Sequence, residues 1–121
     1  TAPLRVRLWE GKFREPDVVF LLAQHADRRG NQYWRGADLA IEVVSEDDPV
    51  RDLVSKRAEY ARAGISEYWI VDPRDQSVSV LSLNSETGDY SVAGRYAPGE
   101  AARSVLLEGF SVEVGEVFSQ N

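Results

Sequence analysis

The sequence predicts an α/β domain in which several short strands accompany one clear helix and a β-hairpin. Short apolar runs rich in β-branched residues recur between turn signals, as strands do. Residues 50–63 repeat apolar side chains at helical spacing. Two alternating segments, 77–83 and 90–96, flank the loop 84–88 in the manner of a hairpin. At 121 residues the chain forms one domain at most.

The first half of the chain reads as three strands and a long loop. Residues 4–9 alternate apolar and basic side chains, as a half-exposed strand does, and a turn is expected at residues 11–12. A second strand is expected at residues 18–22. Residues 23–38 are polar and glycine-containing, which indicates a loop. The third strand, residues 39–45, is apolar and β-branched, and therefore belongs to a core.

The helix carries signals at both of its ends. We expect Asp48 to be its N-cap, Pro49 its first residue and Gly64 its C-terminal cap. Its expected apolar stripe consists of Leu53, Val54, Ala58, Tyr60 and Ala61. Further strands are expected at residues 67–71 and 110–114.

Glu42 is the most informative residue because it lies inside the apolar third strand. A carboxylate there loses hydration at a cost of several kcal/mol unless something replaces it. A metal ion, a cationic side chain or a shifted pKa could compensate. Asp17 opens the second strand, and Lys56 lies on the expected helix. Two carboxylates and a lysine brought together on a sheet can build a metal-dependent phosphodiesterase site.

Composition excludes several classes of protein. The chain has no Cys, so disulfide frameworks and thiolate metal sites are excluded. Its one histidine, His25, is expected to be exposed in a polar loop, and a multi-histidine zinc site is excluded within one chain. No apolar run approaches the roughly 20 residues that span a bilayer, and no signal peptide is visible. We therefore expect no membrane partner and a cytoplasmic location.

The chain contains no Met, even at position 1. A primary translation product starts with Met, so we expect residues 1–121 to be a C-terminal fragment of a longer protein, folded as a single domain.

The net charge of −6, from 20 acidic and 14 basic residues, argues against tight non-specific DNA binding. The distribution is nevertheless uneven. Residues 5–14 contain four basic residues against one acidic residue, and residues 51–62 contain four against two. The two basic segments could form a local positive rim, or they could be two ordinary solvated faces, and the sequence leaves both interpretations open.

A series of short motifs occurs in a fixed order along the chain: Pro16-Asp17, Glu42-Val43-Val44-Ser45, Arg51-Asp52, Lys56, Tyr60, Gly64-Ile65 and Glu67-Tyr68-Trp69-Ile70-Val71-Asp72-Pro73. This series resembles the Uma-two family of restriction-endonuclease-like domains, within the PD-(D/E)XK nuclease superfamily. The similarity covers most of residues 13–118. The resemblance implies a restriction-endonuclease-like central mixed β-sheet with one main helix and a β-hairpin extension, and a missing amino-terminal region.

The resemblance also implies a catalytic site. Asp17 and Glu42 match the two acidic positions of the superfamily motif and would be the metal ligands. The simplest motif has a lysine two residues after the second acid, where this chain has Val44. The resemblance points instead to Lys56 as the third catalytic residue. The implied cofactor is Mg²⁺, with Mn²⁺ as a substitute, because Mg²⁺ prefers oxygen ligands and binds one or two carboxylates together with water and phosphate.

Together with the resemblance, these residues predict an Mg²⁺-dependent endonuclease that hydrolyses phosphodiester bonds in DNA. One alternative is a catalytically inactive nuclease-like module for protein interaction or homodimerisation, which the acidic balance and the expected missing region favour. A second alternative is a carboxylate site for another phosphate substrate, such as RNA or a nucleotide.

Each candidate residue could also have a purely structural role instead of a catalytic one. Asp17 could be an ordinary solvated residue of a turn, and Glu42 could pair with a buried arginine. Lys56 lies four residues after Asp52, which is the spacing of an ordinary helical ion pair.

Tyr60 is on the same helical stripe as Lys56, and we expect its ring to be core. Glu15 could reach a metal if Pro16 does not break the strand alternation. The three tryptophans are expected to be core or interface residues.

Overall fold

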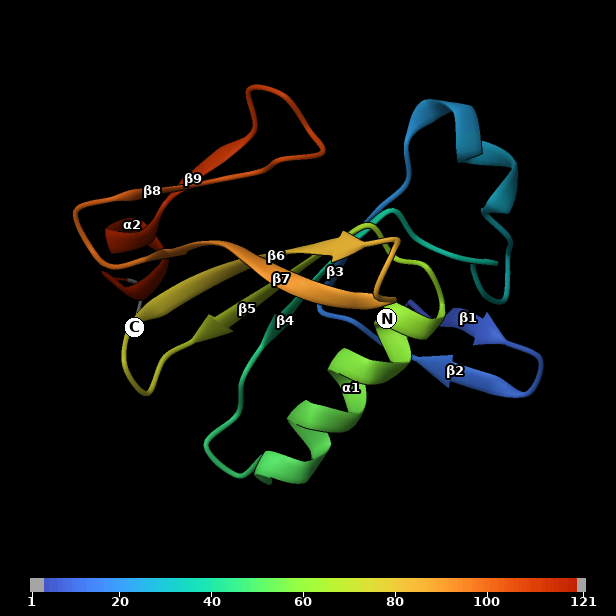
Figure 1. Cartoon of the computed structure of the whole chain (residues 1–121), viewed down its shortest axis with the longest axis horizontal. Coiled ribbons are helices and arrows are strands. Elements are labelled where there is room, and N and C mark those ends of the chain that lie inside the picture. The colour runs from blue at the N-terminus through green and yellow to red at the C-terminus, as the bar shows by residue number, and fades with distance from the viewer. Residues whose placement is uncertain (1–3, 120–121) are drawn as a thin grey trace.

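A five-stranded mixed sheet forms the centre of the protein (Figure 1). The computed structural model describes residues 4–119. β4 and β5 run parallel, whereas the other neighbouring strands are antiparallel. The predicted central mixed sheet and β-hairpin are thereby confirmed. In spatial order the strands are β3 (Val18–Phe20), β4 (Leu39–Val43), β5 (Glu67–Asp72), β6 (Ser77–Asn84) and β7 (Asp89–Tyr96).

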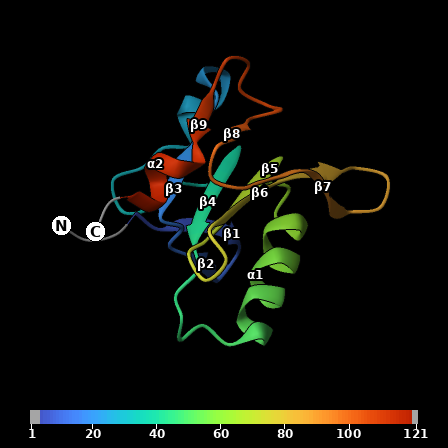
Figure 2. The same ribbon diagram turned by 90° about the vertical axis from the view of Figure 1, so that its left-hand side faces the viewer.

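The two faces of this sheet have different covers. The main helix connects β4 to β5, as a parallel pair requires, and packs on one face. The last elements of the described chain cover the opposite face (Figures 1 and 2). No helix of residues 4–119 is long and apolar enough to cross a membrane. The remaining elements are β1 (Val6–Trp9), β2 (Lys12–Arg14), the 3-10 helix η1 (Ala23–Arg28), α1 (Val50–Arg62), β8 (Ala101–Arg103), β9 (Ser111–Glu113) and α2 (Val114–Ser119).

Strand alternation produces an apolar cluster on each face. Ala40 and Tyr68 point toward α1, whereas their neighbours Leu39 and Trp69 point toward the C-terminal segment. Both clusters are rich in fully buried large side chains, so the sheet itself is the core of the domain. The α1 cluster contains Val6, Ala37, Ala40, Tyr60, Ala61, Ile65, Tyr68, Leu81 and Tyr90. The other contains Leu39, Trp69, Val71, Val78, Val80, Ala102 and Val114.

α1 ends as predicted but begins one residue later. Gly64 has a φ of +79°, and the amides of Ile65 and Gly64 donate to the carbonyls of Tyr60 and Ala61, which together form a Schellman motif. At the start, Pro49 is the N-cap because its backbone is extended. The expected N-cap, Asp48, was wrong. Its side chain instead accepts a hydrogen bond from the Ser45 amide and closes the preceding turn.

The expected apolar stripe of α1 is used only at its C-terminal half. Tyr60 and Ala61 are buried, but Val54 is 62% exposed and Ala58 is also exposed, contrary to expectation. The first turns of α1 present polar side chains to the sheet, and Lys56 is among them. The gap in the stripe is therefore the place where charged groups enter the helix–sheet interface.

The sequence patterns did not predict the short elements correctly. β2 lies where only a turn was expected, and it pairs with β1 over three residues. The loop expected at residues 23–38 contains η1, and the strand expected at residues 110–114 is limited to β9 because Val114 begins α2. β8 was not predicted at all. Elements of three to six residues complete barely one period of an apolar pattern, so neighbouring segments decide their conformation.

Three tyrosine rings, one of them from α1, pack against one another between the helix and the sheet, and their hydroxyl groups have different partners. The Tyr68 ring lies 5.0 Å from the Tyr60 ring and 5.7 Å from the Tyr90 ring, measured between centroids. The Tyr90 hydroxyl donates to the Ile65 carbonyl at 2.6 Å. The Tyr68 hydroxyl is buried and has no hydrogen-bond partner among residues 4–119.

We expect Tyr90→Phe to lower the free energy of unfolding by about 1–2 kcal/mol, because the buried Ile65 carbonyl loses its donor. Tyr68→Phe is expected to be neutral or stabilising, because it removes a hydroxyl that the fold leaves unpaired. Urea unfolding of the two variants tests this difference. An equal loss in both would show that the Tyr68 hydroxyl is also hydrogen-bonded, for example to a bound water.

Candidate active site

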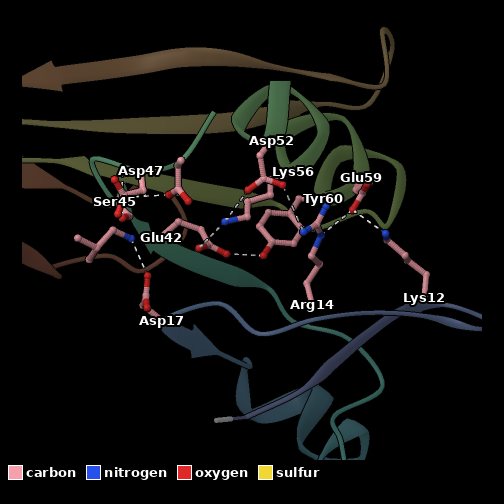
Figure 3. Close-up of polar contacts among 12 residues, drawn as sticks. Lys12, Arg14, Asp17, Glu42, Ser45, Asp47, Asp52, Lys56, Glu59 and Tyr60 are labelled. Atoms are coloured by element: carbon pink, nitrogen blue, oxygen red, sulfur yellow. Dashed lines mark hydrogen bonds and ion pairs between the residues drawn. The ribbon is translucent and has the colours of Figure 1, made fainter. Parts of the chain in front are cut away.

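Glu42 lies on the face of β4 that is turned toward α1, and only 6% of the residue is exposed. The Tyr60 hydroxyl donates a short hydrogen bond of 2.5 Å to Glu42 Oε1. The Lys56 Nζ lies 3.6 Å from Glu42 Oε2. Figure 3 shows both helix side chains directed at this carboxylate. The buried acid is thus held by two groups from successive turns of one helix.

Lys56 contacts two carboxylates at once. Its Nζ lies 3.4 Å from Asp52 Oδ2, four residues earlier on the helix, as well as beside Glu42. The ordinary helical ion pair and the contact to the strand acid therefore coexist. Because the Lys56 side chain is 17% exposed, its ammonium group is mostly shielded from water. A shielded cation acts on neighbouring charge more strongly than an exposed one.

Asp17 immediately precedes β3, and its position is fixed by the neighbouring strand. The Val43 amide donates to Asp17 Oδ2 at 2.7 Å (Figure 3). Val18 pairs with Ile41, and continuing this antiparallel register by one residue sets Asp17 opposite Glu42. Directly opposed residues of an antiparallel pair point to the same face. Asp17 therefore belongs to the same face as Glu42, and its negative charge acts on the Glu42 carboxyl.

The two acids open onto neighbouring hollows that share Glu15. A hollow of about 310 Å³ is lined by Glu15, Glu42, Lys56, Phe13 and Arg14. A second hollow, of about 460 Å³, is lined by Glu15 and Asp17 together with apolar residues. Glu15 lies in the connection between β2 and β3. It is a further carboxylate beside Glu42 and Asp17, in addition to Asp52.

Arg14 is a site residue that the sequence analysis did not identify. Its Nε donates to Glu59 Oε1 at 2.8 Å, and its guanidinium also lies 3.7 Å from Asp52. Lys12 approaches the same Glu59 oxygen at 3.5 Å. The Arg14 hydrogen bond holds the pKa of the Glu59 carboxyl below its usual value. These pairs fasten the β1–β2 hairpin to α1 beside the hollow. In the sequence, the only sign that Arg14 lies near the site is that it directly precedes Glu15.

Burial raises the pKa of the Glu42 carboxyl above its ordinary value. The hydrogen bond from Tyr60 and the positive charge of Lys56 act in the opposite direction, and the charge of Asp17 adds to the increase. The cationic side chain that the sequence analysis allowed as compensation for burial of Glu42 is therefore Lys56, and Tyr60 is a partner that the sequence analysis did not foresee. The same contacts and burial raise the pKa of the Tyr60 hydroxyl, which therefore stays protonated as the donor.

We expect Glu42→Gln to raise the melting temperature at pH 7 in EDTA. A folded-state pKa above the unfolded value means that the native state binds more protons, so stability is lost as pH rises through that interval. Glutamine does not ionise, so no charge is buried at pH 7, and its carbonyl oxygen can still accept the Tyr60 hydrogen bond. The advantage should disappear below about pH 4, where the wild-type carboxyl is protonated in both states.

Glu59→Gln is the matched control, because its pKa is lowered and the sign reverses. This variant should melt below wild type at pH 7, and the difference should vanish in acid. Melting curves from pH 3 to 8 that shift both variants in the same direction would contradict the assignment of the two environments.

The donor set at this site suits a hard cation with few protein ligands. Asp17 and Glu42 supply carboxylate oxygens from adjacent strands, and Mg²⁺ commonly takes one or two carboxylates and completes its octahedron with water and phosphate. Within residues 4–119, no group of three or more His, Cys, Asp or Glu side chains is arranged to hold a metal. The residues therefore fit an open two-carboxylate site and do not form an all-protein cage.

His25 lies outside this site and is not freely exposed, contrary to expectation. Its Nδ1 lies 2.9 Å from Asp38 Oδ2, and the ring is 28% exposed. The Leu22 amide donates to the same Asp38 oxygen at 2.7 Å. Asp38 directly precedes β4, so these contacts fasten η1 to the sheet.

Comparisons with known proteins agree on the fold. A solved structure with a TM-score of 0.71, titled a "putative nuclease belonging to DUF820" from Anabaena variabilis ATCC 29413, is 18% identical to this chain. The alignment covers 98% of this chain and 66% of the other, so the chain spans just under two thirds of that protein. No curated protein sequence matches this chain.

The Uma2 family, described as "Putative restriction endonuclease", matches residues 1–115. This match covers nearly the whole chain and confirms the resemblance that the motifs around Glu42 and Tyr68 indicate. The family description supports an activity of the nuclease type. The chain belongs to the Uma2 family of restriction-endonuclease-like proteins.

Proposed function

We propose that this protein is an endonuclease that hydrolyses DNA phosphodiester bonds with Mg²⁺, or with Mn²⁺ as a substitute. The observation that carries the proposal is the Glu42–Lys56 contact at the wall of an open hollow, with Asp17 opposite Glu42 on the next strand. A buried acid costs stability, and a fold that needed only packing would place an apolar residue there. Retention of the acid beside a shielded lysine favours a chemical role.

In this proposal Asp17 and Glu42 hold the cation. When bound, Mg²⁺ supplies a water of lowered pKa and offsets charge on the scissile phosphate. Lys56 carries the positive charge that faces a non-bridging phosphate oxygen and favours the charge that develops there. Tyr60 keeps the Glu42 carboxylate in a fixed orientation through its hydrogen bond. Asp52 in turn restrains the Lys56 ammonium group.

An inactive module for protein interaction or dimerisation is the second candidate. The net charge of −6 favours it, since most nucleic-acid-binding proteins are basic. In that case the Glu42, Lys56 and Tyr60 contacts would be structural only. The two candidates differ in whether the site binds a divalent ion, which can be measured without any substrate.

We expect Mg²⁺ or Mn²⁺ to raise the melting temperature of the wild type. An ion that binds only the native state, at 100 times its dissociation constant, adds about 2.7 kcal/mol of stability, or roughly 10 °C for a domain of this size. Glu42→Ala should show no such shift, whereas Glu59→Ala, which alters a neighbouring carboxylate outside the site, should retain it. The proposed metal site would be refuted if neither ion raised the melting temperature of the wild type, or if Glu42→Ala showed the same rise.

A further inference from the structure

A third hollow, distinct from the two beside Glu42 and Asp17, is lined by three arginines. Arg7 of β1, Arg28 of η1 and Arg35 of the following loop converge on a space of about 350 Å³. The turn after α1, including Gly64, forms the opposite wall, and no acidic residue lines it. Three like charges around one space repel one another, so the arrangement is one that a bound anion stabilises.

The protein positions the three guanidinium groups but pairs only one of them, that of Arg28, with a carboxylate of residues 4–119. Arg35 donates to the Asp27 carbonyl, and the Arg7 guanidinium carbon lies 5.7 Å from the centre of the Tyr33 ring. Neither makes an ion pair with a carboxylate of residues 4–119, and Arg28 approaches Asp38 only at 3.9 Å. Fixed arginines with free N–H groups match the bidentate geometry of phosphate.

The surroundings of this hollow share the same character. Three more arginines lie over aromatic rings at 3.9 to 5.4 Å, and within the described chain none of them has a carboxylate partner. These pairs are Arg5 with Phe13, Arg29 with Trp34 and Arg62 with Trp9. By contrast Lys12, Arg14 and Lys56, near Glu42, are all paired with acids. Arg29 and Arg62 are thus unpaired sequence neighbours of the lining residues Arg28 and Ala63, whereas Arg51 and Arg103, which also lack a carboxylate partner among residues 4–119, lie elsewhere.

Charge is also segregated along the sequence. Residues 1–36 contain seven basic and four acidic side chains, whereas residues 37–121 contain seven basic and sixteen acidic ones. The net charge of −6 thus conceals one positive region, built by β1, β2, η1 and the loop that follows.

We propose that the hollow formed by Arg7, Arg28 and Arg35 is an oxyanion subsite that binds a phosphate group. Ala37, on its wall, lies five residues before Glu42 along the line of β4, which is a distance of about 16 Å at 3.3 Å per residue. If the proposed function holds, a DNA strand across the site could supply this phosphate several nucleotides from the bond that is cut. Free phosphate is the other source with the same chemistry.

The test measures binding in EDTA, so that it does not depend on cleavage or metal. Inorganic phosphate and a 12-nucleotide fluorescent DNA strand are titrated into ¹⁵N-labelled wild type, and the amides of Gly36, Ala37 and Gly64 are followed. We expect these amides to shift, whereas those of β8 and β9 stay in place. Much tighter binding of the DNA strand than of phosphate identifies a nucleic-acid strand as the source, and comparable affinities identify free phosphate.

Arg7→Gln/Arg35→Gln should weaken binding of the preferred probe at least tenfold. For DNA it should also lower the slope of log Kobs against log salt by about 0.7 per lost phosphate contact. Arg103→Gln is the control, because Arg103 is exposed, has no carboxylate partner among residues 4–119, and belongs to β8 on the other side of the sheet. Absence of shifts at the three wild-type amides, or equal losses in the arginine variant and the control, would overturn the subsite.

Discussion

Alanine at Asp17, Glu42 or Lys56 is expected to abolish metal-dependent DNA cleavage while leaving the fold intact. Asp17 and Glu42 face the same side of adjacent strands, and Lys56 contacts Glu42. If the three groups serve one ion and one phosphate, removing any of them disables the same step. Their effects should then not add, so a double variant should be no worse than a single one. Cleavage of plasmid and oligonucleotide DNA with Mg²⁺ measures this.

The controls use side chains that touch the same network. Tyr60→Phe keeps the ring but removes the hydrogen bond to Glu42, so a loss of about tenfold is expected, which corresponds to about 1.4 kcal/mol. Glu59→Ala releases Arg14 and Lys12 without touching Glu42, and it should retain most activity. EDTA should stop the reaction. Ca²⁺ should bind but support it poorly, because its looser coordination positions water less well.

The proposal concerns the whole protein, and this chain spans 66% of the similar solved protein, so cleavage is measured on the protein at its natural length. If that protein cleaves no double-stranded, single-stranded or branched DNA with Mg²⁺ or Mn²⁺, the endonuclease proposal fails. A metal-induced rise in melting temperature without any cleavage would instead favour a binding module that has kept its ion.

The sequence predicted best those features that rest on a long run of regularly spaced apolar residues or on the free-energy cost of burying a charged group. The apolar run around Glu42 correctly predicted β4, and the spaced apolar residues ending at Gly64 predicted the end of α1. The cost of burying an acid also identified Glu42 as a residue with a partner. These inferences depend on local patterns, which is why one sequence was enough for them.

The remaining features depend on contacts between distant segments. Arg14 and Glu59 are 45 residues apart, and the Tyr60 hydroxyl meets Glu42 across 18 residues. Nothing local distinguishes a tyrosine that only packs from one whose hydroxyl also reaches a carboxylate. The C-terminal segment is similar, since β8, β9 and α2 are each too short to show a period and are held by packing on the sheet.

Glu67→Ala is expected to be the most destabilising single substitution considered for this fold. Glu67 is only 1% exposed, yet its carboxylate accepts four hydrogen bonds. Oε2 accepts from the Trp69 indole and the Ser104 hydroxyl, each at 2.7 Å. Oε1 accepts from the backbone amides of Val105 and Leu106, each at 2.8 Å. One side chain of β5 thereby fastens the loop after β8 to the central sheet.

Alanine would leave four donors without their acceptor, of which the Trp69 indole is buried and the others are partly exposed, and it would open a cavity beside Trp69. A hydrogen bond contributes about 0.5–1.5 kcal/mol net, so the four bonds and the cavity together are expected to cost about 4 kcal/mol from a total that is typically 5–15 kcal/mol. Urea unfolding followed by tryptophan fluorescence measures it. Glu108→Ala, an exposed glutamate of the same C-terminal segment, should change stability by less than about 0.5 kcal/mol.

Glu67→Gln separates the acceptor from the size of the side chain. The amide keeps the volume but turns an NH₂ group toward two of the four donors, so it should lose a large part of the stability that alanine loses. Hydrogen exchange should show the earliest loss of protection at residues 101–118, because Glu67 contacts Ser104, Val105 and Leu106 there. If Glu67→Ala and Glu108→Ala unfold at the same urea concentration, packing against Trp69 alone holds the C-terminal segment, and the four hydrogen bonds contribute nothing net.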